Sequence, residues 1–170
     1  MGKITLAEAV KLKSILTKRI LELEQELRRT AFATVEKGET PTAGPRTFAE
    51  VDAELNDVRK DSRILDRLIY RANIDHVIEF KGEILAIVEA IELATQLRAK
   101  ARLYKEFSAA KKEEIVNMMM EKTLVRIALF NPEDLRQTAV QLEKDAHKLS
   151  NLINAKNYAI TLDFDDSKYF

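Results

Sequence analysis

The chain has 170 residues, with 28 Lys plus Arg against 28 Asp plus Glu, and it contains no cysteine. The formal net charge is therefore zero, which argues against a duplex nucleic-acid binder because such proteins usually show a basic excess. The lack of cysteine excludes disulfide frameworks, zinc–thiolate sites and cysteine nucleophiles.

The composition is typical of long helices: 46% of residues are hydrophobic and 33% charged, with only 4 Gly and 3 Pro. The length suggests one helical domain over residues 1–170. The first nine residues lack an apolar core of signal-peptide length, and no stretch approaches the ~18 apolar residues of a spanning helix. We therefore expect a cytoplasmic protein, with membrane contact disfavoured.

The first helix is predicted over residues 5–36. Thr5-Leu6-Ala7-Glu8 has the form of a capping box, with a hydroxyl at the cap and a carboxylate three residues later. Apolar residues then recur every three or four positions, which places them on one side of a helix. Residues 37–46 hold two Gly and two Pro and are predicted to form a loop.

The second helix is predicted over residues 47–72 and also begins with a capping box, Thr47 to Glu50. Its apolar positions alternate strictly by three and four, which is the heptad pattern of supercoiled helices. These positions are Phe48, Val51, Leu55, Val58, Ser62, Leu65, Ile69 and Ala72. Residues 76–80 are rich in β-branched and aromatic side chains, which predicts a short extended segment.

The third helix is predicted over residues 83–108, with a wide apolar face near its start that suits a bundle interior. Residues 123–130 are rich in strand formers and are predicted to be extended. A fourth helix over residues 132–156 follows the cap and first turn Asn131-Pro132. Residues 159–164 alternate in hydrophobicity, which indicates a last strand.

Together these elements predict a mainly α fold: an antiparallel four-helix bundle, or a pair of long helical hairpins. The extended segments 76–80, 123–130 and 159–164 are expected to gather into a small sheet at one end. Such strands would have unpaired edges that a second subunit can complete.

Short motifs spread over the chain resemble a septicolysin-like group of small, uncharacterised bacterial proteins. The motifs are Leu6-Ala7-Glu8-Ala9, the loop Glu36 to Pro41, Asn73, and Asp145…Leu149…Ile153…Asn157. The chain departs from that group at two positions. It has Tyr158 where the group often has Trp, and it has Ala72 before Asn73 where the group has Thr. The resemblance implies an all-helical core, and its name implies a membrane-active protein.

Candidate catalytic and metal residues are few. His76 and His147 are the only histidines, and neither has a second histidine at helical spacing. The serines lie outside Gly-rich elbows, and lone glycines such as Gly38 and Gly82 indicate turns and not phosphate loops. We expect no enzyme, no metal and no cofactor. One alternative is a metal site built from dispersed carboxylates and His147.

Two stretches have alternative interpretations. Met118-Met119-Met120 suits an adaptable partner surface, but filling of the core where the bundle meets its extended segments is the favoured interpretation. Residues 98–112 hold six basic residues with Tyr104 and Phe107, which allows a membrane or nucleic-acid contact. Interspersed glutamates favour an ordinary solvated helix face.

The leading hypothesis is a non-enzymatic, self-associating structural or interaction module, in a larger assembly such as a virion or with other protein partners. A membrane-active, septicolysin-like protein is the alternative, and nucleic acid is not an expected partner. The expected oligomer or partner contacts are Phe48, Val51, Leu55, Val58, Leu65, Met118, Met119, Met120, Ile160, Leu162 and Phe164.

Overall fold

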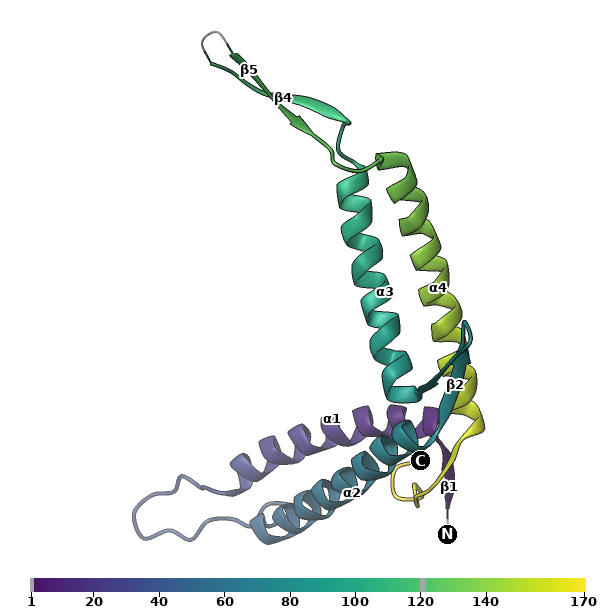
Figure 1. Cartoon of the computed structure of the whole chain (residues 1–170). Helices are drawn as coiled ribbons and strands as arrows, with labels where there is room; N and C mark the ends of the chain where they lie inside the picture. Colours follow the sequence, from purple (N-terminus) through teal and green to yellow (C-terminus); the bar gives the residue numbers. More distant parts are fainter. Residues whose placement is uncertain (1, 120–121) are drawn as a thin grey trace. The chain divides into compact units, whose positions relative to one another are not determined.

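The computed structural model describes residues 2–119 and 122–170, and the fold is mainly α (Figure 1). The helices in the described part are α1 (Leu6–Thr30), α2 (Phe48–Asp75), α3 (Ile87–Ser108) and α4 (Pro132–Ala159). The strands are β1 (Lys3–Thr5), β2 (Val77–Phe80), β3 (Glu83–Ala86), β4 (Glu113–Met119), β5 (Lys122–Ile127) and β6 (Thr161–Asp163).

The chain divides into two compact units. Unit 1 comprises the residues up to Asp75 together with Asn157–Phe170, and unit 2 comprises His76–Lys156. The mainly α prediction is confirmed. A four-helix antiparallel bundle is not confirmed, because α1 and α2 close their apolar core within unit 1.

Unit 1 is built on the α1–α2 pair, and both predicted capping boxes are present. The Glu8 amide donates to Thr5 Oγ1 over 3.1 Å, and the Thr5 amide donates back to the Glu8 carboxylate over 2.7 Å. Thr47 and Glu50 repeat this arrangement at the start of α2. These bonds satisfy amides that the first helical turn leaves free, so each helix begins at its predicted residue to within one position.

The apolar stripes of α1 and α2 form the core of unit 1. Leu12, Leu16 and Leu23 of α1 are fully buried, as are Val51 and Leu65 of α2. The predicted end of the first helix at residue 36 is wrong, because α1 ends at Thr30. The apolar stripe stops at Leu27, so residues beyond Thr30 have no buried face to stabilise another helical turn.

Charged side chains flank this core and fix the pairing of α1 with α2. Arg19 binds Glu54 over 2.5 Å, and Arg46 binds both Glu54 and Glu26. The Arg19 guanidinium lowers the pKa of the Glu54 carboxyl, and Arg46 acts in the same direction. The Arg19–Glu54 pair joins the two helices directly and favours one register, as e and g pairs do in coiled coils, whereas Arg46 ties the loop before α2 to both helices.

Unit 1 also contains a two-stranded sheet that joins the two ends of the chain. Strand β1 pairs antiparallel with β6, with Ile4 opposite Leu162. After β6 the Tyr169 hydroxyl donates to Asp61 of α2 over 2.7 Å. Burial, followed by this bond, raises the pKa of Tyr169 well above its ordinary value. Strand β1 has only three residues, which is too short for its hydrophobic pattern to predict it.

In unit 2, a β-hairpin stands where the third helix was predicted to begin. Residues 83–86 form β3 and pair with β2, so the predicted helix start at residue 83 is wrong and α3 begins at Ile87. Lys81 and Gly82 both have positive φ, 53° and 83°. Two such residues in succession are typical of the type I′ turn, which folds the chain straight back on itself.

Helices α3 and α4 run side by side in unit 2 (Figure 1). The buried residues of the two helices include Ala90, Ala94 and Ala101 on α3 and Ala139 and Ala146 on α4. Side chains also bridge the pair: the Arg98 guanidinium donates to the Ser150 hydroxyl, and Lys105 binds Glu143 over 2.5 Å.

The described strands form three separate two-stranded sheets, β1–β6, β2–β3 and β4–β5. The expectation that the extended segments gather into one sheet is therefore wrong. Strands β2 and β3 pair across a two-residue turn, and β4 pairs with the next strand along the chain, so their hydrogen bonds are satisfied locally. Strand β5 overlaps the predicted extended segment 123–130 but begins one residue earlier, at Lys122, whereas β4 was not predicted.

Candidate functional site

The candidate site is the hairpin of β4 and β5, which we call the arm. It follows α3, continues beyond the ends of the helix pair and leads back into α4 (Figure 1). At its base the Ala128 amide donates to the Lys112 carbonyl over 2.9 Å. This bond extends the strand ladder to the point where the helices begin.

The register of the arm gives it two chemically different faces. Glu113 pairs with Ile127, Glu114 with Arg126, Ile115 with Val125, and Met118 with Thr123. Side chains of paired residues lie on the same face, and the face alternates along each strand.

One face, the apolar face, therefore carries Ile115, Val125 and Ile127, with Glu113 at its base and Thr123 toward its tip. The opposite, polar face carries Glu114, Arg126, Lys122 and Leu124. A register shift between Ile115 and Asn117 places Val116 at a bulge.

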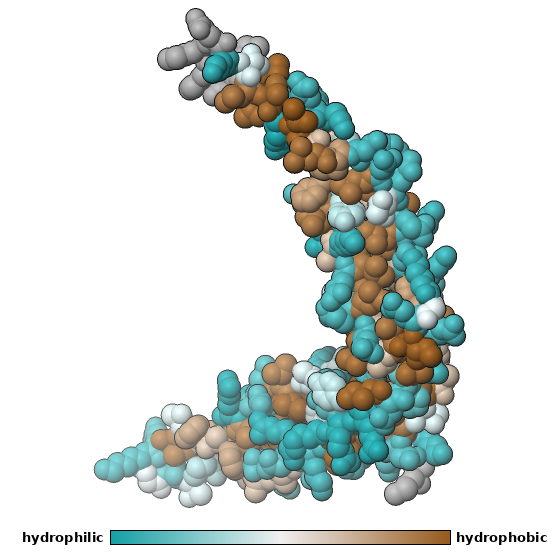
Figure 2. All heavy atoms as spheres, in the orientation of Figure 1, coloured by the Kyte–Doolittle hydropathy of each residue, from teal (hydrophilic) through white to brown (hydrophobic). Residues whose placement is uncertain are grey.

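The apolar face is uncovered in a single chain. Ile115 is 58% exposed, Val125 40% and Ile127 53%. A two-stranded hairpin alone in water is marginally stable at best, and it needs a further apolar surface against its own. Figure 2 shows hydrophobic residues gathered along the arm and the adjoining helices. The arm therefore has the chemistry of a contact surface.

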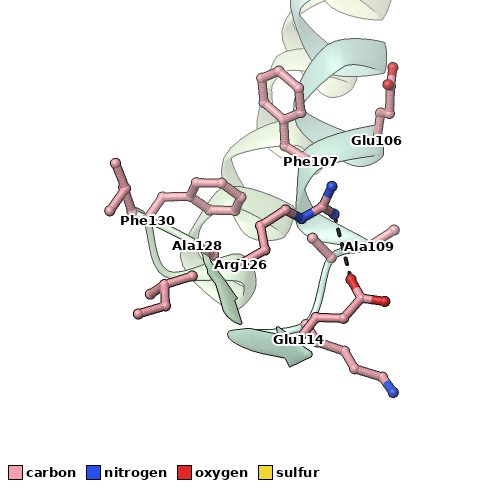
Figure 3. Close-up of a pocket in the computed structure, with 11 residues that line it drawn as sticks. Glu106, Phe107, Ala109, Glu114, Arg126, Ala128 and Phe130 are labelled. Atoms are coloured by element: carbon pink, nitrogen blue, oxygen red, sulfur yellow. Dashed lines mark ion pairs between the residues drawn. The ribbon is translucent and has the colours of Figure 1, made fainter. Parts of the chain in front are cut away.

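The polar face carries an ion pair between Arg126 and Glu114, whose atoms lie 3.7 Å apart (Figure 3). Both side chains are more than half exposed, so water screens the pair and it adds little stability. Its main effect is on solubility, because it keeps this face hydrated while the other face offers apolar side chains.

A groove of about 760 Å³ lies where the arm meets α3. Phe107 of α3 and Phe130 face one another across it, with ring centres 6.3 Å apart (Figure 3). Ile127 and Leu129 also line it, and Leu129 is 96% exposed. Its charged groups are Glu106, Lys111 and the Glu114–Arg126 pair, with no nucleophile beside a base. The groove is suited to binding an apolar side chain.

A second polar feature lies on α4. Asp145 is a buried acid, and its carboxylate accepts hydrogen bonds from the Lys81 ammonium and from Gln141 Nε2, the latter over 3.0 Å. The bond from Lys81 is the main cause that lowers the pKa of the Asp145 carboxyl. Lys81 is at the turn of the β2–β3 hairpin, so the pair ties this hairpin to α4. A hollow of about 540 Å³ adjoins it.

We expect Asp145→Asn to lower the free energy of unfolding of unit 2 by about 1 kcal/mol at neutral pH. The effect is modest because the Lys81 side chain is 58% exposed and water screens the pair. Because the pKa of Asp145 is lowered on folding, its contribution to the free energy of unfolding is fully present above the ordinary pKa of about 3.9. It is lost as the pH falls through the lowered value.

Urea unfolding of the wild type and Asp145→Asn at neutral and acidic pH measures this effect. The matched control is Glu79→Gln, which removes an exposed carboxylate from the same hairpin. A deficit of Asp145→Asn that stays constant into acid would contradict the assignment.

The contact residues predicted from the sequence fall into three groups. Val51, Leu55, Val58, Leu65, Ile160, Leu162 and Phe164 are all buried within unit 1 of one chain. Phe48 is 49% exposed. Met120 lies outside the described residues, as do the side chains of Met118 and Met119, whose backbone belongs to β4. The first group therefore forms intramolecular core and is not exposed surface.

The exposed apolar residues of the arm, Ile115, Val125 and Ile127, were not among the predicted contacts. The alternation of Val125, Arg126 and Ile127 was the available signal. In β4 the bulge interrupts this alternation, because the apolar residues Ile115 and Val116 are adjacent in the sequence.

The histidines do not form a site. The backbone carbonyl of His76 accepts from the Ile87 amide over 3.0 Å, and His147 is exposed on α4 beside Arg102 and Glu143. Within residues 2–119 and 122–170, no three His, Asp or Glu side chains gather as metal ligands. No helix in the same residues has the length and hydrophobicity needed to cross a bilayer.

No protein-family model and no curated protein matches the chain. A similar solved structure is the crystal structure of a functionally unknown conserved protein from Corynebacterium diphtheriae. The identity is 22% and the TM-score 0.62, and the match covers 95% of this chain and 99% of that one. At this identity the likeness shows the fold alone, and the septicolysin-like resemblance stays a prediction.

Proposed function

We propose that the chain is a non-enzymatic structural or interaction protein that assembles with copies of itself through the arm. The observation that carries this proposal is the uncovered apolar face of Ile115, Val125 and Ile127 on a hairpin of only two strands. Each of these side chains gains about 1 kcal/mol or more when the exposed part leaves water. A second apolar surface against this face stabilises both arms together.

The helices next to the arm support the same proposal. Val88, Ile91 and Leu103 of α3 are each between 42% and 48% exposed, and Val140 and Leu152 of α4 are exposed to a similar extent. A helix with apolar residues on more than one side usually lies inside a larger bundle. Pairing of two copies would place α3 and α4 from both chains in a four-helix bundle.

The charge of the chain does not oppose assembly. Equal numbers of basic and acidic residues give a formal net charge of zero, so two copies approach without overall repulsion. Such a module is suited to serve as a repeated component of a larger assembly, including a virion.

Light scattering coupled to size-exclusion chromatography over a wide concentration range tests the proposal. We expect a mass of at least twice 19.4 kDa that decreases on dilution. A mass of one chain at every concentration would contradict it. If that single chain also binds vesicles of neutral phosphatidylcholine and releases an enclosed dye, the membrane-active alternative is favoured instead.

A further inference from the structure

A groove between α3 and α4, which we call the basic groove, has a volume of about 490 Å³. This is within the ~300–1,000 Å³ of ordinary small-molecule sites. The wall on α3 is basic and the wall on α4 is polar, and the lining residues are Arg98, Arg102, Lys105, Glu143, Ala146 and His147. Ala146 has only a methyl side chain, so it leaves the groove open between the charged groups.

The three basic residues of the groove recur at spacings of four and three, so they lie on one side of α3. They belong to the basic stretch 98–112, in which glutamates are interspersed. The structure separates the two kinds of charge, because Glu106 and Glu114 line the groove at the base of the arm instead. Among the described residues that line the basic groove, Glu143 is the one acid. Leaving His147 aside, the lining therefore has a formal surplus of two positive charges.

The middle cation of the three is the one without a partner. The Arg98 guanidinium donates to the Ser150 hydroxyl and Lys105 binds Glu143, so both outer residues are tied to α4. Arg102 lies between them and forms no hydrogen bond or ion pair within residues 2–119 and 122–170. All five N–H donors of its guanidinium are therefore available to an anion in the groove.

The lining suits phosphate groups better than a carboxylate. The fork of a single arginine already satisfies both oxygens of a carboxylate, whereas a phosphate group has more acceptor oxygens and more charge. The positions from Arg98 to Lys105 extend over ~10 Å along α3, which is longer than one phosphate group. The length and the charge of this wall therefore fit two phosphate groups in succession.

We propose that the basic groove binds a ligand with two linked phosphate groups, of the pyrophosphate class. Arg102 donates to the centre of the ligand, Arg98 and Lys105 bind its two ends, and His147 donates a ring N–H from α4. A soluble diphosphate ester and a lipid with a diphosphate headgroup share this chemistry. The proposal does not depend on self-association through the arm.

Isothermal titration calorimetry of the whole chain with inorganic pyrophosphate tests the proposal. We expect Arg102→Gln to raise the Kd at least about tenfold, because it removes charge-assisted hydrogen bonds. Arg102 is exposed and has no partner in the described structure, so this variant should fold normally.

Lys100→Gln is the matched control, because it removes the same charge from the same helix. Lys100 lies on the opposite side of α3 from Arg98, with its ammonium over the Tyr104 ring. At an ionic strength of ~0.1 M a charge across the helix is largely screened, so the Kd should change less than about twofold. Equal weakening by the two variants would mean that pyrophosphate is attracted only by diffuse charge, which overturns the proposal.

His147→Ala tests the wall on α4 and should raise the Kd by about threefold or more. No effect of this variant would place the ligand on α3 alone, and the groove would then be the wrong site. Flotation with phosphatidylcholine vesicles that contain diacylglycerol pyrophosphate identifies the source of the ligand. Vesicle binding that depends on Arg102 supports a lipid headgroup, and binding of pyrophosphate without vesicle binding supports a soluble ligand. If the wild type binds neither, the proposal is wrong.

Discussion

Val125→Asp is expected to dissociate the assembly, raising its Kd by about 100-fold or more, which corresponds to about 2.7 kcal/mol. Val125 is at the centre of the apolar face, opposite Ile115 on β4. In a stacked pair of arms, the substitution places two carboxylates in a surface that excludes water. Burying an ionised group without a partner costs several kcal/mol, and the two carboxylates also repel one another.

Leu124→Asp is the matched control for this prediction. Leu124 is the next residue of the same strand, is 60% exposed and lies on the polar face. Both variants put an acid into β5, so both carry a similar loss of strand propensity. Sedimentation velocity should show dissociation for Val125→Asp and nearly wild-type association for Leu124→Asp. Equal effects of the two variants would mean that the apolar face is not the contact.

Leu65→Ala is expected to lower the free energy of unfolding of unit 1 by about 2–5 kcal/mol. Leu65 is fully buried in the α1–α2 core. Its truncation removes apolar contacts and leaves a cavity that neighbouring helices fill only in part. A loss of this size is a large fraction of the stability of an ordinary domain.

The matched control is Leu21→Ala in α1, because Leu21 is 56% exposed and its truncation should cost less than about 0.5 kcal/mol. Urea unfolding at a concentration low enough to keep the chain dissociated gives both values. A cost for Leu65→Ala as small as that for Leu21→Ala would show that α1 and α2 are not packed through this stripe.

The helices that could be predicted well are those whose ends carry a chemical signal. The Thr5–Glu8 and Thr47–Glu50 capping boxes marked the starts of α1 and α2, and Asn131-Pro132 marked the start of α4. The heptad stripe of α2 predicted which residues are buried, but periodicity cannot say whether the covering helix belongs to the same chain. For this reason Val51 and Leu55 were expected at an oligomer contact.

The errors arise where one pattern fits two structures. Ile84 continues the spacing of Ile87 and Ile91, so helical periodicity covered the residues that form β3. The turn at Lys81 and Gly82 decides the structure there, because both residues adopt positive φ. Gly82 indicated a turn, but a lysine before it does not indicate the type I′ turn, since Asn, Asp and Gly are the usual occupants of that position.

The candidate site was the least predictable part of the molecule. The two faces of the arm depend on the pairing of β4 with β5 and on the bulge after Ile115, and neither is visible in a single strand. Strand β4 also begins with Glu113 and Glu114, and glutamate is uncommon in strands. The sequence showed extended residues near 123–130, but it could not show that their apolar side chains share one uncovered face.

Hydrogen-exchange mass spectrometry of the wild-type chain at low and high concentration tests self-association through the arm most directly. The amides of β4 and β5 and of the end of α3 should exchange more slowly at high concentration, because stacking stabilises the hairpin and excludes water from it. The α1–α2 pair should show the same protection at both concentrations. Unchanged exchange in the arm while the mass doubles would contradict the account, because the copies would then meet elsewhere.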